Sequence, residues 1–222
     1  MNSDPGSDIN RTLGQQALLQ VRKLALLCSR TCPGSIIVQT LDMVRSLRET
    51  SWTVISGFQS PIEQECLGIL LRGERPVIVC PARSVEGMRL STAWKDAVTT
   101  GRMLITSPFD TKVRRATAET AEERNRFVVS LADAVFIPHA SRGGSLDRLC
   151  RDQIAGRKPI LTLDDPANAH LTGMGARLFY ANALFQFDEA SNARRPRIES
   201  DPETCCNPAS SPGGDHDREQ SQ

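Results

Sequence analysis

The residues best suited to chemistry lie in a glycine-rich turn, HASRGGS at 139–145, which follows the apolar run Ala134–Pro138 and precedes a helical pattern. A strand that enters a Gly/Ser turn and then a helix leaves backbone N–H groups free at the carboxyl end of a sheet, and such groups bind phosphate. We therefore predict that Gly143, Gly144 and Ser145 form a phosphate-binding turn. The alternative is an ordinary strand–helix turn in which Ser145 caps the helix.

Two guanidinium groups and an amide stand just upstream, at Arg124, Asn125 and Arg126. Planar guanidinium groups match the geometry of phosphate. Residues two apart on a helix point in different directions, so we expect one arginine to bind phosphate and the other to pair with Glu122 or Asp133. Asn125 is expected to join neighbouring loops. The alternative for either arginine is a solvated surface charge.

Residues that follow the apolar runs 23–28 and 52–56 extend the predicted site. Ser29 and Arg30 are expected to contact an anion, and Ser56 and Gly57 to line the next loop. Simple turn chemistry is the alternative for all four. Glu63 stands at the start of a helix, where it could act as an acid or base, or could interact favourably with the helix N-terminus.

The cysteines and histidines predict no metal site. The chain has seven cysteines and three histidines, and the odd number of cysteines indicates free thiols in a reducing cytoplasm. Cys28 and Cys32 have the spacing of half a metal site, but no second half follows at ligand spacing. His139, at the end of an apolar run, could titrate near neutral pH or serve as a structural hydrogen-bonding group. No cofactor is expected, and no catalytic residue is assigned.

Length and composition fit one α/β domain with tails, since the chain has 222 residues, of which 39% are apolar. With Lys+Arg 27 against Asp+Glu 26, any electropositive patch must be local. The start of the chain has no signal-peptide core, and no apolar stretch approaches the length of a membrane span, so no membrane partner is expected. We expect a disordered segment over 1–10, a folded domain over 11–188 and a disordered polar tail over 189–222.

Short apolar strands alternate with helical patterns along the folded region. The expected strands are 23–28, 52–56, 76–80, 102–106, 134–138 and 159–163. The expected helices are 11–21, 36–47 with Ser35 as its cap, 62–72, 94–100, 116–131 and 145–155. This alternation predicts an α/β fold with a doubly wound, mainly parallel, Rossmann-like sheet of about six strands and helices on both faces. Ligands of such sheets bind beyond the carboxyl ends of the strands, where the strand order reverses.

Three stretches resemble the DNA-processing protein A (DprA/Smf) family of the SLOG superfamily. Leu26–Arg30 resembles its "VGSR" and Val54–Phe58 its "VVSGLA". Glu123–Arg126, followed by a strand and Gly143–Leu146, resembles its "RNRIIAGLS…SGSL". Order and spacing agree over roughly residues 20–172. The resemblance implies a Rossmann-like domain that binds a nucleotide or single-stranded DNA without turnover, in DNA processing, uptake or recombination, and it also implies a homodimer.

The chain departs from that family pattern at several places. Pro61–Glu65 stands where the family has a "GID" helix start, and Cys28 stands where the family has glycine, which restricts backbone approach to a ligand. The chain is too short for the helical and winged-helix domains that flank the core in full-length relatives. We therefore expect a compact and divergent relative.

Two other functions remain open. A LOG-type hydrolase of nucleotide N-glycosidic bonds would carry "PGGxGTxxE", but here Arg148 occupies the position of the glutamate and Asp147 is one place away. A small-nucleotide sensor domain is the second alternative. Binding of single strands normally uses aromatic platforms, for which Phe58, Phe109 and Phe136 are the few candidates.

Overall fold

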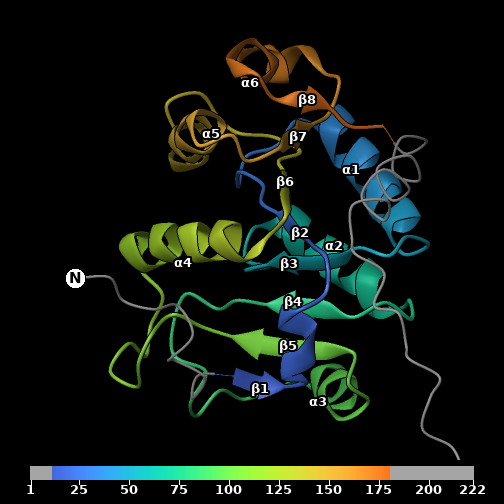
Figure 1. The fold of residues 1–222 in the computed structure, drawn as a ribbon, viewed down its shortest axis with the longest axis vertical. Coiled ribbons are helices and arrows are strands. Elements are labelled where there is room, and N and C mark those ends of the chain that lie inside the picture. Colours follow the sequence, from blue (N-terminus) through green and yellow to red (C-terminus); the bar gives the residue numbers. More distant parts are fainter. Residues whose placement is uncertain (1–11, 181–222) are drawn as a thin grey trace, which may run out of the picture.

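The computed structural model describes residues 12–180 and contains one sheet of eight strands (Figure 1). The strand order is β1-β5-β4-β3-β2-β6-β7-β8. β1 runs antiparallel to β5, and every other neighbouring pair is parallel. The predicted fold class, a doubly wound and mainly parallel α/β sheet, is confirmed. The expectations for residues 1–10 and 189–222 lie outside the described residues.

The elements alternate regularly along the chain. The strands are β1 (Thr12–Gly14), β2 (Lys23–Leu26), β3 (Thr53–Ser56), β4 (Val77–Val79), β5 (Met103–Thr106), β6 (Ala134–Phe136), β7 (Ile160–Thr162) and β8 (Arg177–Leu178). The helices are α1 (Gly34–Leu47), α2 (Pro61–Leu71), α3 (Thr92–Thr99), α4 (Ala118–Leu131), α5 (Ser145–Ala155) and α6 (Ala169–Met174), with short 3₁₀ helices at η2 (Gln16–Leu19) and η3 (Pro166–Asn168).

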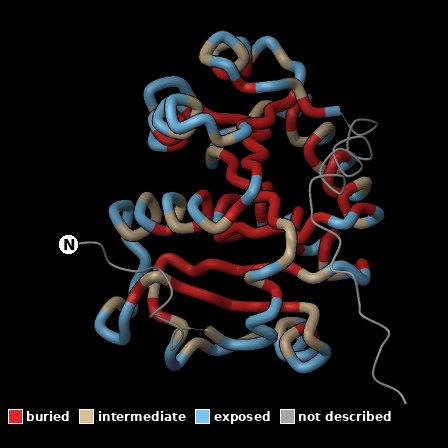
Figure 2. Tube along the Cα trace, in the orientation of Figure 1, coloured by how far each residue is buried: buried red, intermediate tan, exposed pale blue. Residues whose placement is uncertain are grey.

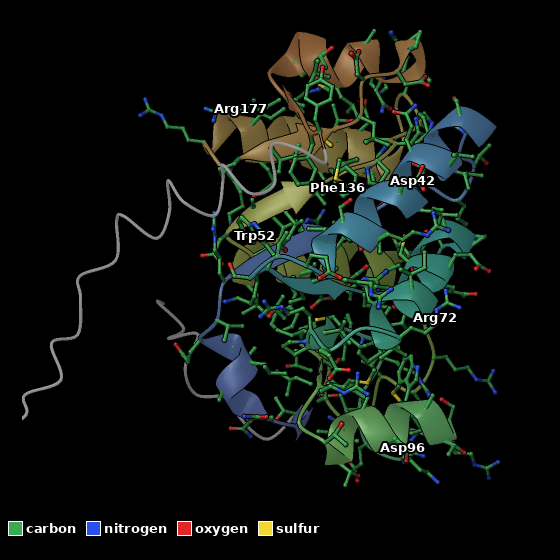
Figure 3. All side chains as sticks on the ribbon, turned by 90° about the vertical axis from the view of Figure 1, so that its right-hand side faces the viewer. Asp42, Trp52, Arg72, Asp96, Phe136 and Arg177 are labelled. Carbon is green, nitrogen blue, oxygen red and sulfur yellow. The ribbon has the colours of Figure 1, made fainter. Side chains whose placement is uncertain are left out.

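Helices cover both faces of the sheet, which explains why its central strands are apolar throughout. Side chains of α1, α2 and α3 share one buried cluster with one face of the sheet, and those of α4, α5 and α6 share a second cluster with the other face. Figure 2 shows the buried strands running through the middle of the molecule. Figure 3 views the first face, where Asp42 on α1, Arg72 at the end of α2 and Asp96 on α3 lie exposed. Parallel strands buried on both faces require near-continuous apolar runs.

The strand order reverses between β2 and β6. β2 to β5 build one half of the sheet in sequence order, and β6 to β8 build the other half on the opposite side of β2. β2 and β6 are paired in parallel, with Leu26 opposite Phe136. Their carboxyl ends therefore lie side by side and form the switch point at which ligands of such folds bind.

The helix expected over 11–21 is wrong. The segment forms β1 and η2 instead, because Thr12–Gly14 pairs with the free edge of β5. Gly14 has φ +107°, and a Cβ built on it would lie 2.3 Å from the carbonyl oxygen of Met103. This close approach of two backbones needs glycine at position 14. The apolar spacing from which a helix was expected carries no sign of that strand pairing.

Other differences from the sequence expectations are smaller. Ser35 does not cap α1, since the helix begins at Gly34 with Pro33 as the cap residue, and the Ser35 hydroxyl donates to Asp165 Oδ2 instead at 2.8 Å. The pattern also missed α6 and the two-residue strand β8. No helix within residues 12–180 combines the length and the apolar character that crossing a membrane requires.

Candidate ligand site at the switch point

A hydrogen bond across the switch point joins the loops that follow β2 and β6. The Ser29 hydroxyl accepts from the N–H of Ser141 at 3.0 Å, and the Ser29 N–H donates to the carbonyl of His139 at 3.0 Å. Arg30 and Arg142 directly follow the two linked serines, and both are exposed. Neither guanidinium has a hydrogen-bond or ion-pair partner within residues 12–180. The guanidinium groups of Arg30 and Arg142 therefore place two positive charges, with no counter-charge among the described residues, next to the Ser29–Ser141 hydrogen bond, which is the junction of the two loops.

The glycine-rich turn next to this junction depends on both of its glycines. Gly143 has φ +71°, a conformation that favours glycine. Gly144 is the cap residue of α5, and a Cβ built on it would lie 2.9 Å from the carbonyl oxygen of Ser141. Ser145 is therefore the first residue of α5 and not its cap. The first N–H groups of a helix have no intrahelical acceptor, and those of α5 lie at the carboxyl edge of the sheet.

Asp147 holds the turn in place from inside the protein. Its side chain is only 5% exposed, and its Oδ2 accepts from the N–H of Gly143 at 3.0 Å and from Arg151 Nη2 at 3.3 Å. Its Oδ1 lies 3.6 Å from Nε2 of His170. Arg148, at the position of the hydrolase glutamate, donates to the Gly143 carbonyl at 2.9 Å. Sequence reasoning considered Asp147 only as a displaced acid and missed this positional role.

The structure brings part of the basic segment, residues 124–126, to the glycine-rich turn. Asn125, Arg126, Ser145 and Arg148 line one small crevice between α4 and α5. The Arg126 side chain is 67% exposed and lies 3.9 Å from Glu122. The expectation that one arginine pairs with Glu122 is thus confirmed for Arg126, which keeps most of its surface open to solvent.

Arg124 is buried and bonds to protein groups. Its Nη1 donates to the Cys80 carbonyl at 3.1 Å, Nη2 to Oε1 of Gln59 at 3.1 Å, and Nε to Oδ1 of Asn125 at 2.9 Å. Burial lowers the pKa of Arg124, and the nearby Glu63 carboxylate opposes that shift. Arg124 therefore joins the loops that follow β3 and β4, while Asn125 helps to orient it.

Ser56 and Gly57 form the turn that receives Arg124. A Cβ built on Gly57 would lie 0.9 Å from Nη1 of Arg124, so any side chain there would displace the guanidinium. The Ser56 hydroxyl accepts from the N–H of Phe58 at 3.2 Å, and Phe58 has φ +49°. Both Ser56 and Gly57 are buried, so the structure places them beneath the site surface.

Glu63 joins the loops that follow β2 and β3. Its carboxylate accepts from the N–H groups of Cys28 at 2.8 Å, Gln59 at 2.9 Å and Ser60 at 3.2 Å. In return, the Ser60 hydroxyl accepts from the Glu63 N–H and caps α2. Burial raises the pKa of the Glu63 carboxyl, while the Cys28 N–H and the Arg124 charge oppose the shift. With its oxygens occupied in this way, Glu63 positions loops.

The histidine and the phenylalanines that the sequence offered as a titrating group and as stacking platforms are buried. His139 is 8% exposed, and its Nδ1 lies 3.0 Å from Oδ1 of Asn168. Phe58, Phe109 and Phe136 are all buried, so none presents a ring face to a base. Residues 12–180 contain no group of three or more His, Cys, Asp or Glu side chains that could hold a metal ion.

A cavity of about 660 Å³ lies at the far edge of the sheet, away from the switch point. Its lining includes Leu13 of β1, Met88 from the loop after β4, and Phe109 and Asp110 from the loop after β5. No residue of the predicted site lines it.

Residues 11–183 match the sequence profile of the family described as DNA recombination-mediator protein A. The chain belongs to this family. The DprA resemblance seen in the three sequence motifs is thereby confirmed. No curated protein matches the chain at a significant level.

Solved structures of DNA processing protein A share the fold of this family member. The protein from Helicobacter pylori, whose single-stranded DNA binding mode has been described, is similar with a TM-score of 0.65 and 19% identity, over 82% of this chain and 86% of that one. The protein from Streptococcus pneumoniae gives a TM-score of 0.65 and 17% identity, over 80% of this chain and 65% of that one. This chain thus spans slightly less than two thirds of the second protein.

A molybdenum cofactor carrier protein from Chlamydomonas reinhardtii is also similar, with a TM-score of 0.53 and 10% identity over 78% of this chain and 99% of that one. The likeness across such different proteins shows how widely this Rossmann-like core is used. Fold alone therefore does not decide the ligand.

Proposed function

We propose that this DprA-family chain binds single-stranded DNA at the switch point through the phosphates of the strand, without turnover. The observation that carries the proposal is the junction between Ser29 and Ser141. Next to it lie Arg30 and Arg142, whose exposed guanidinium groups have no partner within residues 12–180. The N-terminus of α5 begins three residues after Arg142 and adds backbone donors and a positive dipole. The single-stranded DNA binding of the H. pylori relative supports this choice of ligand.

The proposed contacts divide into an exposed set and a buried set. The first N–H groups of α5, from Ser145 on, receive one phosphate. Gly143 and Gly144 shape the turn that presents them, since their own N–H groups donate to Asp147 and Ser141. The exposed arginines provide charge-assisted hydrogen bonds worth about 1.5–3 kcal/mol each. The buried set supports these loops from below without touching the ligand. It consists of Ser56, Gly57, Glu63 and Arg124, with Asn125 at the boundary between the two sets.

The burial of the three candidate phenylalanines favours recognition of the backbone over stacking on bases. Binding that relies on phosphates is insensitive to base sequence and weakens steeply with salt, because each neutralised phosphate releases condensed counterions. We therefore expect little discrimination among bases.

Two contacts favour binding over hydrolysis. The carboxylate of Asp147 is buried and engaged by Gly143 and Arg151, so it has no open path to a glycosidic bond. Arg148 also donates to Glu122 at 3.3 Å, and an arginine does not supply the carboxylate that the hydrolase motif uses. A small nucleotide bound at the same phosphate position remains the second candidate, because it would use the same donors.

Fluorescence anisotropy with a labelled oligothymidylate, measured on reduced protein at several salt concentrations, tests the proposal. We expect log affinity to fall linearly with log salt, and unlabelled oligonucleotide to compete far better than a nucleoside monophosphate. The double variant Arg30→Ala/Arg142→Ala should lose at least about tenfold in affinity, the equivalent of roughly 1.4 kcal/mol.

The matched control is Arg45→Ala/Arg177→Ala, which removes the same charge from exposed positions near the amino ends of the strands. Equal losses in the two double variants would show that the effect is one of general charge, and would contradict a site at the switch point. Preference for the mononucleotide would favour the sensor function. Light scattering would test the homodimer that the family resemblance implies.

A further inference from the structure

Two side chains from the segment that joins η3 to α6 hold the loop between β6 and α5. Asn168 is the last residue of η3, and His170 is the second residue of α6. α6 packs against α5 (Figure 1), and this brings both side chains to the loop that carries the glycine-rich turn. Neither residue stands among those predicted from the sequence, because the pattern did not reveal α6.

Asn168 is completely buried, and both of its side-chain polar atoms are bonded. Its Nδ2 donates to the carbonyls of Pro138 at 2.7 Å and Leu163 at 3.3 Å, so its Oδ1 is left to accept. This Oδ1 lies 3.0 Å from Nδ1 of His139, which therefore carries a hydrogen. Asn168 thus fixes the backbone of Pro138 and the ring of His139.

His170 holds the next residue of the loop. Its side chain is 8% exposed, and its Nε2 lies 2.9 Å from the carbonyl oxygen of Ala140. A carbonyl oxygen only accepts hydrogen bonds, so Nε2 carries a hydrogen and donates it. The other ring nitrogen, Nδ1, is buried and has no hydrogen-bond partner within residues 12–180. Nε2 is therefore the atom through which the ring acts.

The same Nε2 faces the carboxylate that supports the glycine-rich turn. It lies 3.6 Å from Oδ1 of Asp147, which is too long for a hydrogen bond but close enough for attraction between the N–H and the carboxylate. This Oδ1 is buried without a hydrogen-bond partner in the described part of the chain. The other oxygen, Oδ2, accepts from the Gly143 N–H. His170 therefore stands against two supports of the loop, the Ala140 carbonyl and the Asp147 carboxylate.

The loop is fixed almost throughout, and its free residue is the one that the proposed site uses. With the bonds at Ser141 and Gly143 included, every residue from 138 to 143 except Arg142 is hydrogen-bonded to another element or loop. Arg142 is left free to contact a ligand. A loop that is ordered before the ligand arrives loses less conformational freedom on binding, and this strengthens the binding.

We propose that His170 is a positioning residue of the switch-point site. Its Nε2–H, acting through Ala140 and Asp147, holds the loop before α5 in the form that receives a phosphate, without contact between His170 and the ligand. The effect on binding rests on the proposed function, whereas the hold on the loop does not.

Three variants of the full chain separate the hydrogen bond of His170 from its packing. His170→Leu keeps a side chain of similar volume and removes the donor, whereas His170→Gln carries an amide N–H that can reach the Ala140 carbonyl. Leu18→Ala is the control for stability. Leu18 lies in η2, is buried in the same apolar cluster as α5 and α6, and makes none of the hydrogen bonds of the loop.

Anisotropy with labelled oligothymidylate measures the affinity of each variant, at a temperature at which circular dichroism shows it to be folded. His170→Leu should bind about threefold to tenfold more weakly than the wild type, and His170→Gln should bind within about twofold of it. Leu18→Ala should unfold at a lower temperature and keep its affinity. Equal losses in His170→Leu and His170→Gln, or an equal loss in Leu18→Ala, would make His170 an ordinary residue of the core and overturn the proposal.

Two further measurements keep the proposal open to refutation if His170→Leu does not fold. His170→Asn then takes its place, because the shorter amide does not reach the Ala140 carbonyl, and the same loss of affinity is expected. NMR of the ring nitrogens of the wild type should show a hydrogen on Nε2 in the histidine whose signal is lost in His170→Gln. A ring hydrogen on Nδ1 alone would overturn the proposal.

Amide hydrogen exchange tests the hold on the loop without any ligand. The N–H groups of Ser141 and Gly143 donate to Ser29 and Asp147, and they should exchange at least about threefold faster in the variant that lacks the donor, while the amides of β3 and β4 keep their rates. Unchanged exchange at both positions would overturn the proposal. If the wild type binds no oligonucleotide, the proposed function fails, and the exchange rates still decide whether His170 holds the loop.

Discussion

The guanidinium of Arg124 lies against the α-carbon of Gly57, so closely that a Cβ on Gly57 would fall 0.9 Å from Nη1. This contact explains the glycine of the Ser56-Gly57 turn and the first arginine of the segment 124–126. Gly57 leaves room for the Arg124 side chain from α4, and Arg124 bonds to buried protein groups instead of facing solvent. The loops that carry the proposed site are therefore fixed by a buried charge from a distant helix.

Gly57→Ala should destabilise the protein by about 1–3 kcal/mol or more, because the new methyl group overpacks the site and displaces a buried guanidinium from its partners. Urea unfolding gives this free energy. Gly68→Ala is the matched control: Gly68 is an exposed position of α2 with no atom within 4 Å of a built Cβ. That variant should gain up to about 1 kcal/mol from helix propensity. Similar results for both would contradict the packing argument.

The double variant Gly57→Ala/Arg124→Ala should be less destabilised than the sum of its single variants, since removal of the guanidinium leaves room for the alanine. A coupling energy of about 0.5–3 kcal/mol is expected for residues in direct contact. The same unfolding assay measures it. Strict additivity would mean that the two residues act independently.

The sequence predicts the layered α/β fold because runs such as Val77–Val79 are short, apolar and separated by helical patterns. It does not reveal the edges of the sheet, since β1 and β8 are too short to have a period and form only by pairing with a neighbour. The spacing of Arg124 and Arg126 predicts that their side chains point in different directions, but which arginine points inward depends on Gly57, a residue far away in sequence.

The part of the site that could be predicted is the backbone part. Glycine at 143 and 144 follows from turn geometry, and the structure gives a reason for each. Arg142 was not among the predicted site residues, although its place just before the two glycines was a usable signal. The roles of Asp147 and Glu63 could not be predicted, because a carboxylate that accepts backbone N–H groups has the same sequence appearance as one that faces a ligand.

The two arginines of the basic segment should behave differently when each is replaced by alanine. Arg126→Ala should lower affinity for oligothymidylate by about threefold to tenfold, roughly 0.7–1.4 kcal/mol, without changing the thermal midpoint. Arg124→Ala should lower the thermal midpoint by several degrees, since Cys80 and Gln59 lose their buried donor. Arg45→Ala serves as the surface control. A stable Arg124→Ala protein that has lost all binding would instead make Arg124 a direct ligand contact.

Asp147→Asn should bind oligothymidylate nearly as well as the wild type, because the amide oxygen can still accept from the Gly143 N–H. Asp147→Ala removes that acceptor, and should weaken binding and loosen the turn. Chromatography of nucleoside monophosphates incubated with the wild type should show no release of base. Base release that Asp147→Asn abolishes would contradict the binding proposal and favour the hydrolase.

Gly144→Val should abolish the contribution of the glycine-rich turn and lower affinity for any phosphate-bearing ligand by more than about tenfold. Gly144 has φ −73°, which valine tolerates, so the obstacle is steric: its Cβ would lie 2.9 Å from the Ser141 carbonyl, which accepts the Gly144 N–H at 3.0 Å. Opening this turn displaces the backbone donors at the start of α5 and strains the adjoining Ser29–Ser141 link, while the sheet and its buried clusters are unaffected. Gly68→Val, at an open position of α2, should change stability by less than about 0.5 kcal/mol, since valine is a slightly better helix former than glycine, and should leave affinity unchanged. Equal affinities of the two folded variants, measured by anisotropy at low salt, would remove the glycine-rich turn from the proposed site.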